Sequence, residues 1–296
     1  MRIQPEAPSD AESEEKGINI FSEHSLHDAL KRRAAGAGGR IEVAVGGRIA
    51  DAVRADGEIV EVQTSGLAAV QEKAKTWAAE GRRIRVQYPI VTSCTIIRID
   101  SRTGEVLSRR KSPKRREFWH AFDELIHAPA LIATPGLVFE TLMVEVTERR
   151  EVLPVPVRRG RYPRYYVTID RSLDGILSSR EFTCAEDWLA LLPGSASVAG
   201  SGDFDAKGAG IGTGAGISAS AGIGAGAGIG ASAGTLWSSE SLGSALGIQT
   251  AAARKVLYSL ARAGLLENAG VEGRRKWYRR ADASRAAARP SAGGAV

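Results

Sequence analysis

The stretch "DAVRADGEIVEVQT", residues 51–64, contains two short apolar runs that are separated by the turn-forming sequence Arg-Ala-Asp-Gly. The run "RIEVAV" comes before it, and a Gly-Gly pair joins that run to "RIADAV", which overlaps the start of the stretch. Short alternating runs that are joined by Gly-containing turns are typical of antiparallel strands. The sequence therefore predicts a three-strand meander, and residues 51–64 hold the end of its second strand and all of its third.

Two carboxylates stand at the polar positions of this meander. Side chains alternate along a strand, so Glu61 and Gln63 share one face while Val62 points to the other. Asp51 lies across the tight turn from Glu61 and can point to the same face when the two strands are adjacent. Two carboxylates so placed can hold a hard divalent cation such as Mg²⁺, with the carbonyl of Val62 as a further ligand. An Asp and a Glu on an exposed sheet face also arise by chance, and that is the alternative.

Helical patterns flank the meander on both sides. "INIFSEHSLHDALKRR" ends in cations before a Gly-rich stop, and "LAAVQEKAKTWAAEG", residues 67–81, places its apolar residues on one face. "RIRVQYPI" and "CTIIRID" then indicate two further strands. The order helix, three strands, helix, two strands predicts an α/β layer with a partly covered sheet. His24 and His27, on the first helix, are expected at its surface or its end, because no second pair with zinc-like spacing accompanies them.

The composition is that of a globular protein with room for two domains. The 296 residues are 43% hydrophobic and 25% charged. No apolar run approaches the about 18 residues of a membrane span, the N-terminus is acidic and the two cysteines are far apart, so we expect a cytoplasmic protein with no membrane partner. The expected parts are a disordered acidic N-terminus (1–17), the α/β core (18–110), a mixed helix and strand extension (111–193), a Gly/Ala/Ser-rich flexible linker (194–234), a C-terminal domain (235–282) and a disordered tail (283–296).

The C-terminal domain has the pattern of a small DNA-binding module. Two helices joined by a turn at Gly247 are followed by a β-hairpin that ends in "KWYRR". This order resembles the winged helix-turn-helix family, which implies that the second helix docks on DNA and that the hairpin neutralises phosphates. The residues that would do so are Thr250, Arg254 and Lys255 on the helix and Arg274, Arg275 and Lys276 on the hairpin. A packing module for protein contact or dimerisation is the alternative, so a homodimer is also among the expected partners.

A second concentration of cations lies at residues 101–116, "SRTGEVLSRRKSPKRR", within a chain whose net charge is +6. Pro113 prevents an uninterrupted helix there. We expect exposed cations of this run to contact a nucleic-acid backbone. They are Arg109, Arg110, Lys111, Lys114 and Arg115. A solvated surface loop is the alternative.

The core pattern resembles the PD-(D/E)XK nuclease superfamily over residues 18–100. A helix with a carboxylate precedes strands that carry an aspartate and then Glu-x-polar, and the residues that match are Glu23, Asp51, Glu61, Val62 and Gln63. The whole chain also resembles a group of bacterial proteins that join such a domain to a C-terminal winged helix. The resemblance implies a restriction-endonuclease-like core, a DNA partner and a supporting role for Glu23.

The resemblance further implies hydrolysis of DNA phosphodiester bonds with Mg²⁺ or Mn²⁺. Asp51, Glu61 and the carbonyl of Val62 would hold the ion, which lowers the pKa of a bound water and polarises the scissile phosphate. Gln63 stands where the family most often has lysine, and a neutral amide can only hydrogen-bond. Lys73, on the following helix, is the expected substitute for the missing ammonium group, and Gln63 would help to position water. The competing function is a catalytically inactive nuclease fold that acts as a DNA-binding regulator.

Overall fold

The computed structural model describes residues 24–159, 162–194 and 235–282. The described residues form two compact units: unit 1 comprises those within 1–121 and 136–181, and unit 2 comprises those within 122–135 and 182–296. The expected acidic N-terminus, almost all of the expected linker and the expected C-terminal tail lie outside the described residues, as does Glu23.

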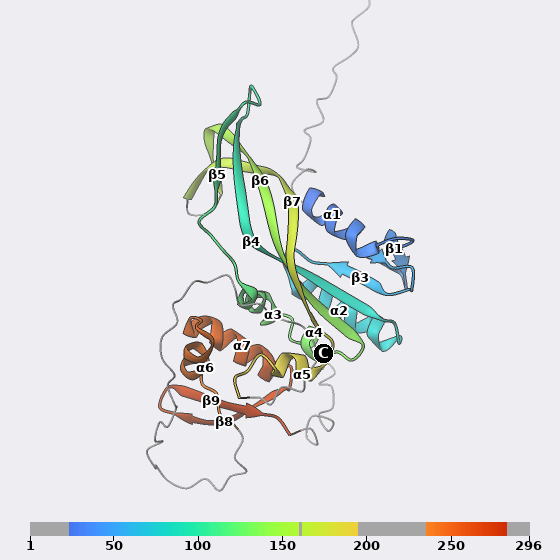
Figure 1. Cartoon of the computed structure of the whole chain (residues 1–296), viewed down its shortest axis with the longest axis vertical. Coiled ribbons are helices and arrows are strands. Elements are labelled where there is room, and N and C mark those ends of the chain that lie inside the picture. Colours follow the sequence, from blue (N-terminus) through green and yellow to red (C-terminus); the bar gives the residue numbers. More distant parts are fainter. Residues whose placement is uncertain (1–23, 160–161, 195–234, 283–296) are drawn as a thin grey trace, which may run out of the picture. The chain divides into compact units, whose positions relative to one another are not determined.

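Unit 1 is built on a seven-stranded mixed sheet (Figure 1). The strands are β1 (Arg40–Val45), β2 (Arg48–Val53), β3 (Ile59–Val62), β4 (Ile84–Asp100), β5 (Val106–Lys111), β6 (Leu137–Arg159) and β7 (Tyr162–Phe182). Their order across the sheet is β1-β2-β3-β4-β6-β7, and β5 pairs with β4 beside this path. The first three strands are mutually antiparallel, whereas β3, β4 and β6 run parallel. The expected mixed α/β class is therefore confirmed.

The sequence predicts the meander correctly but divides β4 wrongly. The glycines at 46 and 47, between β1 and β2, both have positive φ, which suits a tight hairpin turn. "RIRVQYPI" and "CTIIRID" are not separate strands, because β4 is continuous through both. The residues between these runs are Val91, Thr92 and Ser93, which include two β-branched residues that favour extended chain and no glycine or proline that would end it. A register shift between Val91 and Ser93 absorbs the irregularity instead.

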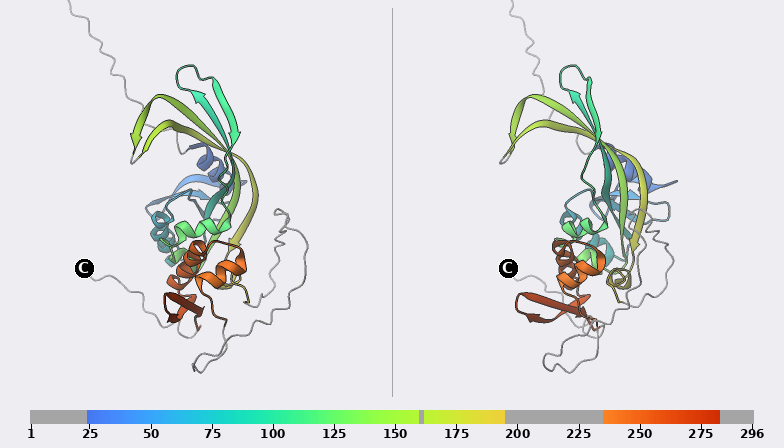
Figure 2. Two further views of the ribbon diagram at one scale, coloured as in Figure 1. Left: turned by 90° about the vertical axis from the view of Figure 1, so that its left-hand side faces the viewer. Right: turned by 60° about the vertical axis from the view of Figure 1, so that its left-hand side comes forward.

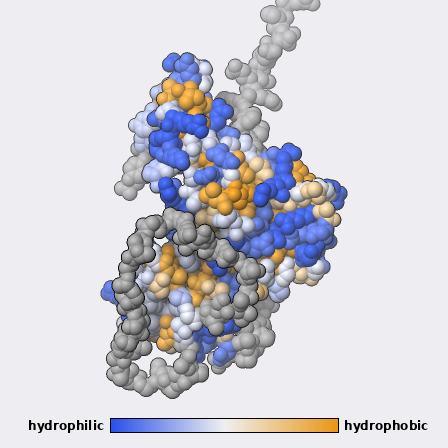
Figure 3. All heavy atoms as spheres, viewed as in Figure 1, coloured by the Kyte–Doolittle hydropathy of each residue, from blue (hydrophilic) through white to orange (hydrophobic). Residues whose placement is uncertain are grey.

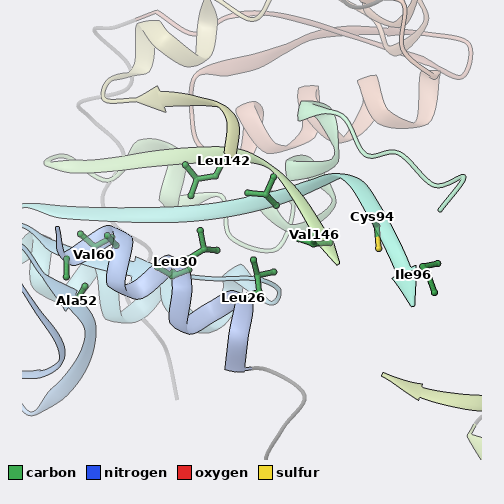
Figure 4. Close-up of a cluster of buried hydrophobic side chains, with 12 residues drawn as sticks. Leu26, Leu30, Ala52, Val60, Cys94, Ile96, Leu142 and Val146 are labelled. Carbon is green, nitrogen blue, oxygen red and sulfur yellow. The ribbon is translucent and has the colours of Figure 1, made fainter. Parts of the chain in front are cut away.

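Two helices cover opposite faces of the sheet around β3. Leu30 of α1 (His24–Ala35) is fully buried and belongs to a cluster with Val60 and Val62 of β3 (Figure 4). Because strand side chains alternate, Glu61 points to the other face, where it meets Lys73 of α2 (Leu67–Ala79). The cluster under α1 is made of Leu26, Leu30, Ala34, Ala35, Ala52, Val60, Val62, Cys94, Ile96, Leu142, Val144 and Val146. The candidate carboxylates therefore lie where both helices meet the end of β3.

Beyond the helices, unit 1 continues as two long ribbons, β4 with β5 and β6 with β7 (Figure 1, Figure 2). Hydrophobic and hydrophilic residues are interspersed on their surface (Figure 3). The exposed apolar side chains of the ribbons include Val106, Leu107, Val155, Tyr165 and Leu177.

Unit 2 joins the predicted C-terminal domain to two segments of the expected extension. Its elements are α3 (Phe122–Leu125), α4 (Ala130–Ala133), α5 (Ala185–Leu189), α6 (Ser239–Leu246), α7 (Thr250–Arg262), β8 (Leu266–Glu272) and β9 (Arg275–Arg280). Trp188 of α5 is almost fully buried, stacks on Phe182 at 3.9 Å between ring centroids and meets Phe122 edge-on. Trp237 pairs with Tyr278 of β9. Residues 111–193 are therefore shared between the two units, and aromatic packing is the physical reason.

The run "EFWHAFDELIHAPALIA", which looks helical from its sequence, folds as three short pieces. A 3₁₀ turn, η1 (Phe118–Ala121), precedes α3, and α4 begins after Pro129. None of the helices in the described part of the chain is long and apolar enough to cross a membrane.

Candidate active site

The ladder between β2 and β3 opens at the two predicted carboxylates. Its paired residues are Ala52 with Val60 and Val53 with Ile59. Beyond them, Val62 N–H donates to Asp51 Oδ2 at 2.8 Å, and Asp51 N–H donates to Glu61 Oε1 at 3.2 Å. Each carboxylate thus accepts an amide of the opposite strand in place of a backbone carbonyl. This exchange brings Asp51 and Glu61 together at one point of the sheet.

Cationic side chains from both helices meet this carboxylate pair. From α2, Lys73 Nζ donates to Glu61 Oε2 at 2.8 Å. From α1, Lys31 Nζ lies 3.3 Å from Asp51 Oδ1, and His27 Nε2 lies 3.5 Å from Asp51 Oδ2. The pair is therefore flanked by two ammonium groups and an imidazole.

The imidazole of His27 also forms a hydrogen bond with the carbonyl oxygen of Val62, the backbone atom that is expected to bind metal. His27 Nε2 donates to the carbonyl oxygen of Val62 at 2.7 Å. The expectation that His27 has a surface or helix-end role is corrected here: its side chain is only 26% exposed and lies against the carboxylate pair. The four-residue spacing between His27 and Lys31 on one helix was the available signal, because such residues share a face.

Burial and neighbouring charge move the pKa values of the two carboxyl groups in opposite directions. Burial raises the pKa of Glu61 above its usual value, an effect that Lys73 offsets only in part and that the charge of Asp51 reinforces. Burial also acts to raise the pKa of Asp51, but hydrogen bonds from His27 and from the amide of Val62 outweigh it, and that pKa is lowered. The hydrogen bond to Asp51 raises the pKa of His27. Ionisation is therefore favoured at Asp51, whereas burial disfavours it at Glu61 despite the ion pair with Lys73.

Gln63 lies in the same strand end but does not join the carboxylates. Its amide nitrogen donates to the carbonyls of Ser65 and Gly66, in the turn that leads into α2. The amide therefore stabilises that turn. Lys73 is the cation that this helix places on Glu61.

A third carboxylate, which the sequence did not single out, lies on β1. Glu42 is opposite Asp51, because its neighbours Ile41 and Val43 pair with Ala52 and Ala50. Glu42 Oε1 accepts a hydrogen bond from Lys31 at 3.4 Å. Its φ of 54° makes it the one non-glycine residue with positive φ in the described part of the chain. No sequence signal announces a glutamate in this conformation.

The donor set suits a magnesium ion that keeps much of its hydration. The described residues contain no cluster of three or more His, Cys, Asp or Glu side chains arranged to hold a metal. Mg²⁺ commonly retains several waters and binds through one or two carboxylates together with substrate phosphates. Asp51, Glu61 and the carbonyl of Val62 fit that requirement, because they provide two carboxylates and a carbonyl oxygen at one point of the sheet. An ion at this point would share the Val62 carbonyl with His27.

The basic run of residues 101–116 forms an edge strand and the loop after it. β5 pairs with β4 alone, and Arg109, Arg110 and Lys111 are all exposed on it. Lys114 and Arg115, in the following loop, are exposed as well. None of these five side chains has a carboxylate partner among the described residues.

In unit 2 the predicted DNA-contacting residues divide into exposed and paired groups. Thr250 and Arg254 are exposed on α7, as are Arg274 and Lys276 at the hairpin. Lys255 instead forms an ion pair with Asp123 of α3 at 2.6 Å. Arg275 Nε lies 3.6 Å from Glu240 Oε2, and its guanidinium stacks 5.7 Å from the ring centroid of Trp277. Arg254 is therefore the most accessible of the predicted cations on α7.

The sequence of unit 1 matches that of a known protein family. The domain of unknown function DUF8091 matches residues 24–183. The chain belongs to this family. The DUF8091 match covers α1 to β7, and with them every described residue of the candidate site, whereas α5 to β9 of unit 2 lie beyond it.

This DUF8091 chain is also similar to a protein of Treponema pallidum. An uncharacterized protein of Treponema pallidum (strain Nichols) is 35% identical over 182 residues, which are 60% of this chain and 70% of that protein. No solved structure matches the chain.

Proposed function

We propose that the protein is a metal-dependent nuclease that hydrolyses DNA phosphodiester bonds at Asp51 and Glu61. The observation that carries this proposal is the opened β2–β3 ladder, in which each carboxylate accepts an amide from the opposite strand. Burying two carboxylates side by side is unfavourable unless a cation compensates them. A purely structural hairpin would pair its backbone groups and leave such side chains in solvent.

The residues of the site have separate roles in this proposal. Asp51, Glu61 and the carbonyl of Val62 would hold Mg²⁺ or Mn²⁺, which supplies a nucleophile at neutral pH and polarises the scissile phosphate. Lys73 holds its ammonium group beside Glu61 and stabilises the negative charge that develops on the phosphate. Gln63 orders the turn before α2, and thereby the helix that carries Lys73.

Unit 2 and β5 would bring DNA to the site. The order α6, turn, α7, β8, β9 supports a winged helix-turn-helix module, with Thr250 and Arg254 of α7 accessible for base or phosphate contacts. The exposed cations of β5 and of the loop after it offer a sequence-independent phosphate contact. Lys255 contributes to this surface only when its ion pair with Asp123 opens.

A second candidate function is a nuclease fold that binds DNA without cleaving it. The observation that favours it is that both carboxylates already have lysine partners and that His27 holds the Val62 carbonyl. A divalent ion would have to compete with these internal cations. The nuclease candidate requires that the divalent ion displaces these internal cations, and the regulator candidate requires that it does not.

Cleavage of supercoiled plasmid and of single-stranded DNA in Mg²⁺ or Mn²⁺ separates the candidates. The nuclease proposal expects cleavage by the wild type that Asp51→Ala and Glu61→Ala both abolish. Glu72→Ala is the matched control, because Glu72 lies on the same helix as Lys73 but forms an exposed ion pair with Lys75. Cleavage that persists in both site variants would come from another source.

The regulator is tested by the electrophoretic mobility of a DNA duplex. A non-cleaving wild type should still shift the duplex, the shift should survive Asp51→Ala, and Arg254→Ala should weaken it with a reduced salt dependence. Absence of any DNA binding at low salt would remove both candidates.

A further inference from the structure

We propose that Lys31 binds a phosphate of the nucleic-acid substrate and that Glu42 positions its ammonium group. This inference rests on the proposed nuclease site, because it assigns a cation to the substrate side of the same carboxylate pair. Lys31 is a substrate-contacting residue in this scheme, and Glu42 is a positioning residue that acts through it.

The contacts of Lys31 leave its ammonium group with unused hydrogen-bonding capacity. Its Nζ lies 3.3 Å from Asp51 Oδ1 and 3.4 Å from Glu42 Oε1, near the outer limit for hydrogen bonds. An ammonium group has three donors, yet Lys31 makes one hydrogen bond to the described residues, the contact to Glu42. Lys73 differs, since it lies 2.8 Å from Glu61 and 5.1 Å from the ring centroid of Trp77. The contacts of Lys31 with its carboxylates are therefore looser than the contact of Lys73 with Glu61.

The carboxylate partner of Lys31 on β1 is exposed to solvent. The side chain of Lys31 is 15% exposed, whereas Glu42, on the outer side of the pair, is 66% exposed. A phosphate can compete for Lys31 with the exposed carboxylate of Glu42 more easily than it could with a buried one. Glu61, which holds Lys73, is only 5% exposed. The two lysines are similarly exposed, at 15% for Lys31 and 20% for Lys73, so what distinguishes them is the partner: Lys31 has an exposed carboxylate that a phosphate can displace, and Lys73 has a buried one.

The backbone conformation of Glu42 is strained, and the surrounding structure holds it in place. A non-glycine residue in the left-handed region is strained and persists only when its surroundings hold it there. Glu42 adopts a φ of 54° on an edge strand, opposite Asp51. Its carboxylate lies 3.4 Å from Lys31 Nζ and so competes with Asp51 for that ammonium group. Without Glu42, Lys31 would pair with Asp51 alone and would be withdrawn from substrate.

The chemistry of the site requires such a cation. Two carboxylates repel an incoming phosphate, and a cation beside them offsets that repulsion. Gln63 cannot do so, because it is neutral and its amide is engaged in the turn before α2. Lys31 supplies a second positive charge, from the first helix, beside that of Lys73.

The test measures the affinity for a short fluorescent DNA duplex by anisotropy in EDTA, at several salt concentrations. Each lost phosphate contact reduces the slope of log affinity against log salt by about 0.9. When the salt concentration rises fourfold, the affinity of the wild type should therefore fall by a factor about 3.5 times larger than the factor for Lys31→Met. Lys31→Arg keeps the charge and should keep the slope. Lys75→Met is the matched control, because Lys75 pairs with Glu72 away from the carboxylates, and its slope should match the wild type.

The change in DNA affinity caused by Glu42→Gln shows whether Glu42 positions Lys31 or only adds a negative charge, because the two roles predict changes in opposite directions. Removal of an exposed carboxylate near DNA should tighten binding by reducing repulsion. If Glu42 positions Lys31, the same substitution weakens binding and lowers the slope as Lys31→Met does. Tighter binding by Glu42→Gln would overturn the positioning role, and an unchanged slope in Lys31→Met would overturn the phosphate contact.

The outcomes also distinguish this inference from the nuclease proposal. Metal-dependent cleavage that Asp51→Ala abolishes, together with an unchanged salt slope in Lys31→Met, refutes the inference alone. A reduced slope in Lys31→Met without any cleavage by the wild type refutes the nuclease while the phosphate contact stands. Loss of the slope in Lys31→Arg as well as in Lys31→Met would show that folding, not charge, had changed, and would refute the inference.

Discussion

Replacement of Lys73 with methionine perturbs the electrostatic balance of the opened ladder directly. Lys73 Nζ lies 2.8 Å from Glu61 Oε2, and the two side chains are 20% and 5% exposed. Removal of one partner from a buried ion pair costs about 3–5 kcal/mol, because the other charge is left uncompensated. Lys73 is partly exposed and Glu61 keeps the hydrogen bond from Asp51 N–H, so we expect Lys73→Met to cost less than this range, about 2 kcal/mol.

The loss should depend on pH in a direction that follows from Glu61. Its pKa already exceeds the ordinary value of 4.5, and Lys73 is one of the groups that lower it. Lys73→Met therefore raises the pKa further. A carboxyl group with a raised folded-state pKa contributes stability that is present below its ordinary pKa and is lost as the pH rises through the folded-state pKa. The penalty of Lys73→Met should be full near neutral pH and should shrink as the pH falls toward 4.5.

Hydrogen–deuterium exchange of the β3 amides in EDTA measures this free energy within unit 1. In a Glu61→Gln background no buried charge is left behind, so Lys73→Met should cost less than about 0.5 kcal/mol. Lys75→Met, which breaks an exposed pair with Glu72, is the control and should cost less than about 0.5 kcal/mol in either background. An equal cost of Lys73→Met with and without Glu61 would refute the assigned ion pair.

Three further predictions concern the same unit. The pKa of His27 is raised above 6.5 by its hydrogen bond to the neighbouring aspartate, so its stabilising contribution is full below pH 6.5 and is lost as the pH rises through the folded-state pKa. The difference in stability between wild type and His27→Gln, measured by urea unfolding, should therefore shrink with rising pH. A difference that stays constant with pH would contradict this prediction. Glu42→Gly should be more stable than Glu42→Ala by about 1 kcal/mol in the same assay, because glycine adopts positive φ without strain, and the reverse order would exclude that conformation. Leu30→Ala removes a fully buried side chain and should lower the free energy of unfolding by about 2–5 kcal/mol, whereas a loss under about 1 kcal/mol would place Leu30 outside the core.

Local sequence patterns predict the meander well because its turns are specified by glycines within the turns themselves. Glycines at 46, 47 and 57 all adopt positive φ in the turns where the sequence places them. The helix over residues 67–79 follows from its periodicity, and its apolar face is buried as predicted. β6 and β7 were not predicted, although they are neighbours in sequence, because their mixed basic and apolar runs carry no clear alternation and because β6 pairs in parallel with β4, which is distant in sequence.

The sequence by itself determined the strands that carry Asp51 and Glu61 and the helix that carries Lys73, since alternation and helical spacing are properties of neighbouring residues. Only the tertiary structure decided how these charges are matched. His27 and Lys31 reach Asp51 because α1 packs on β3 through Leu30, and Glu42 joins them through strand pairing. Contacts between segments distant in sequence leave no periodic trace, so the cations around the carboxylates become visible only when the sheet is assembled.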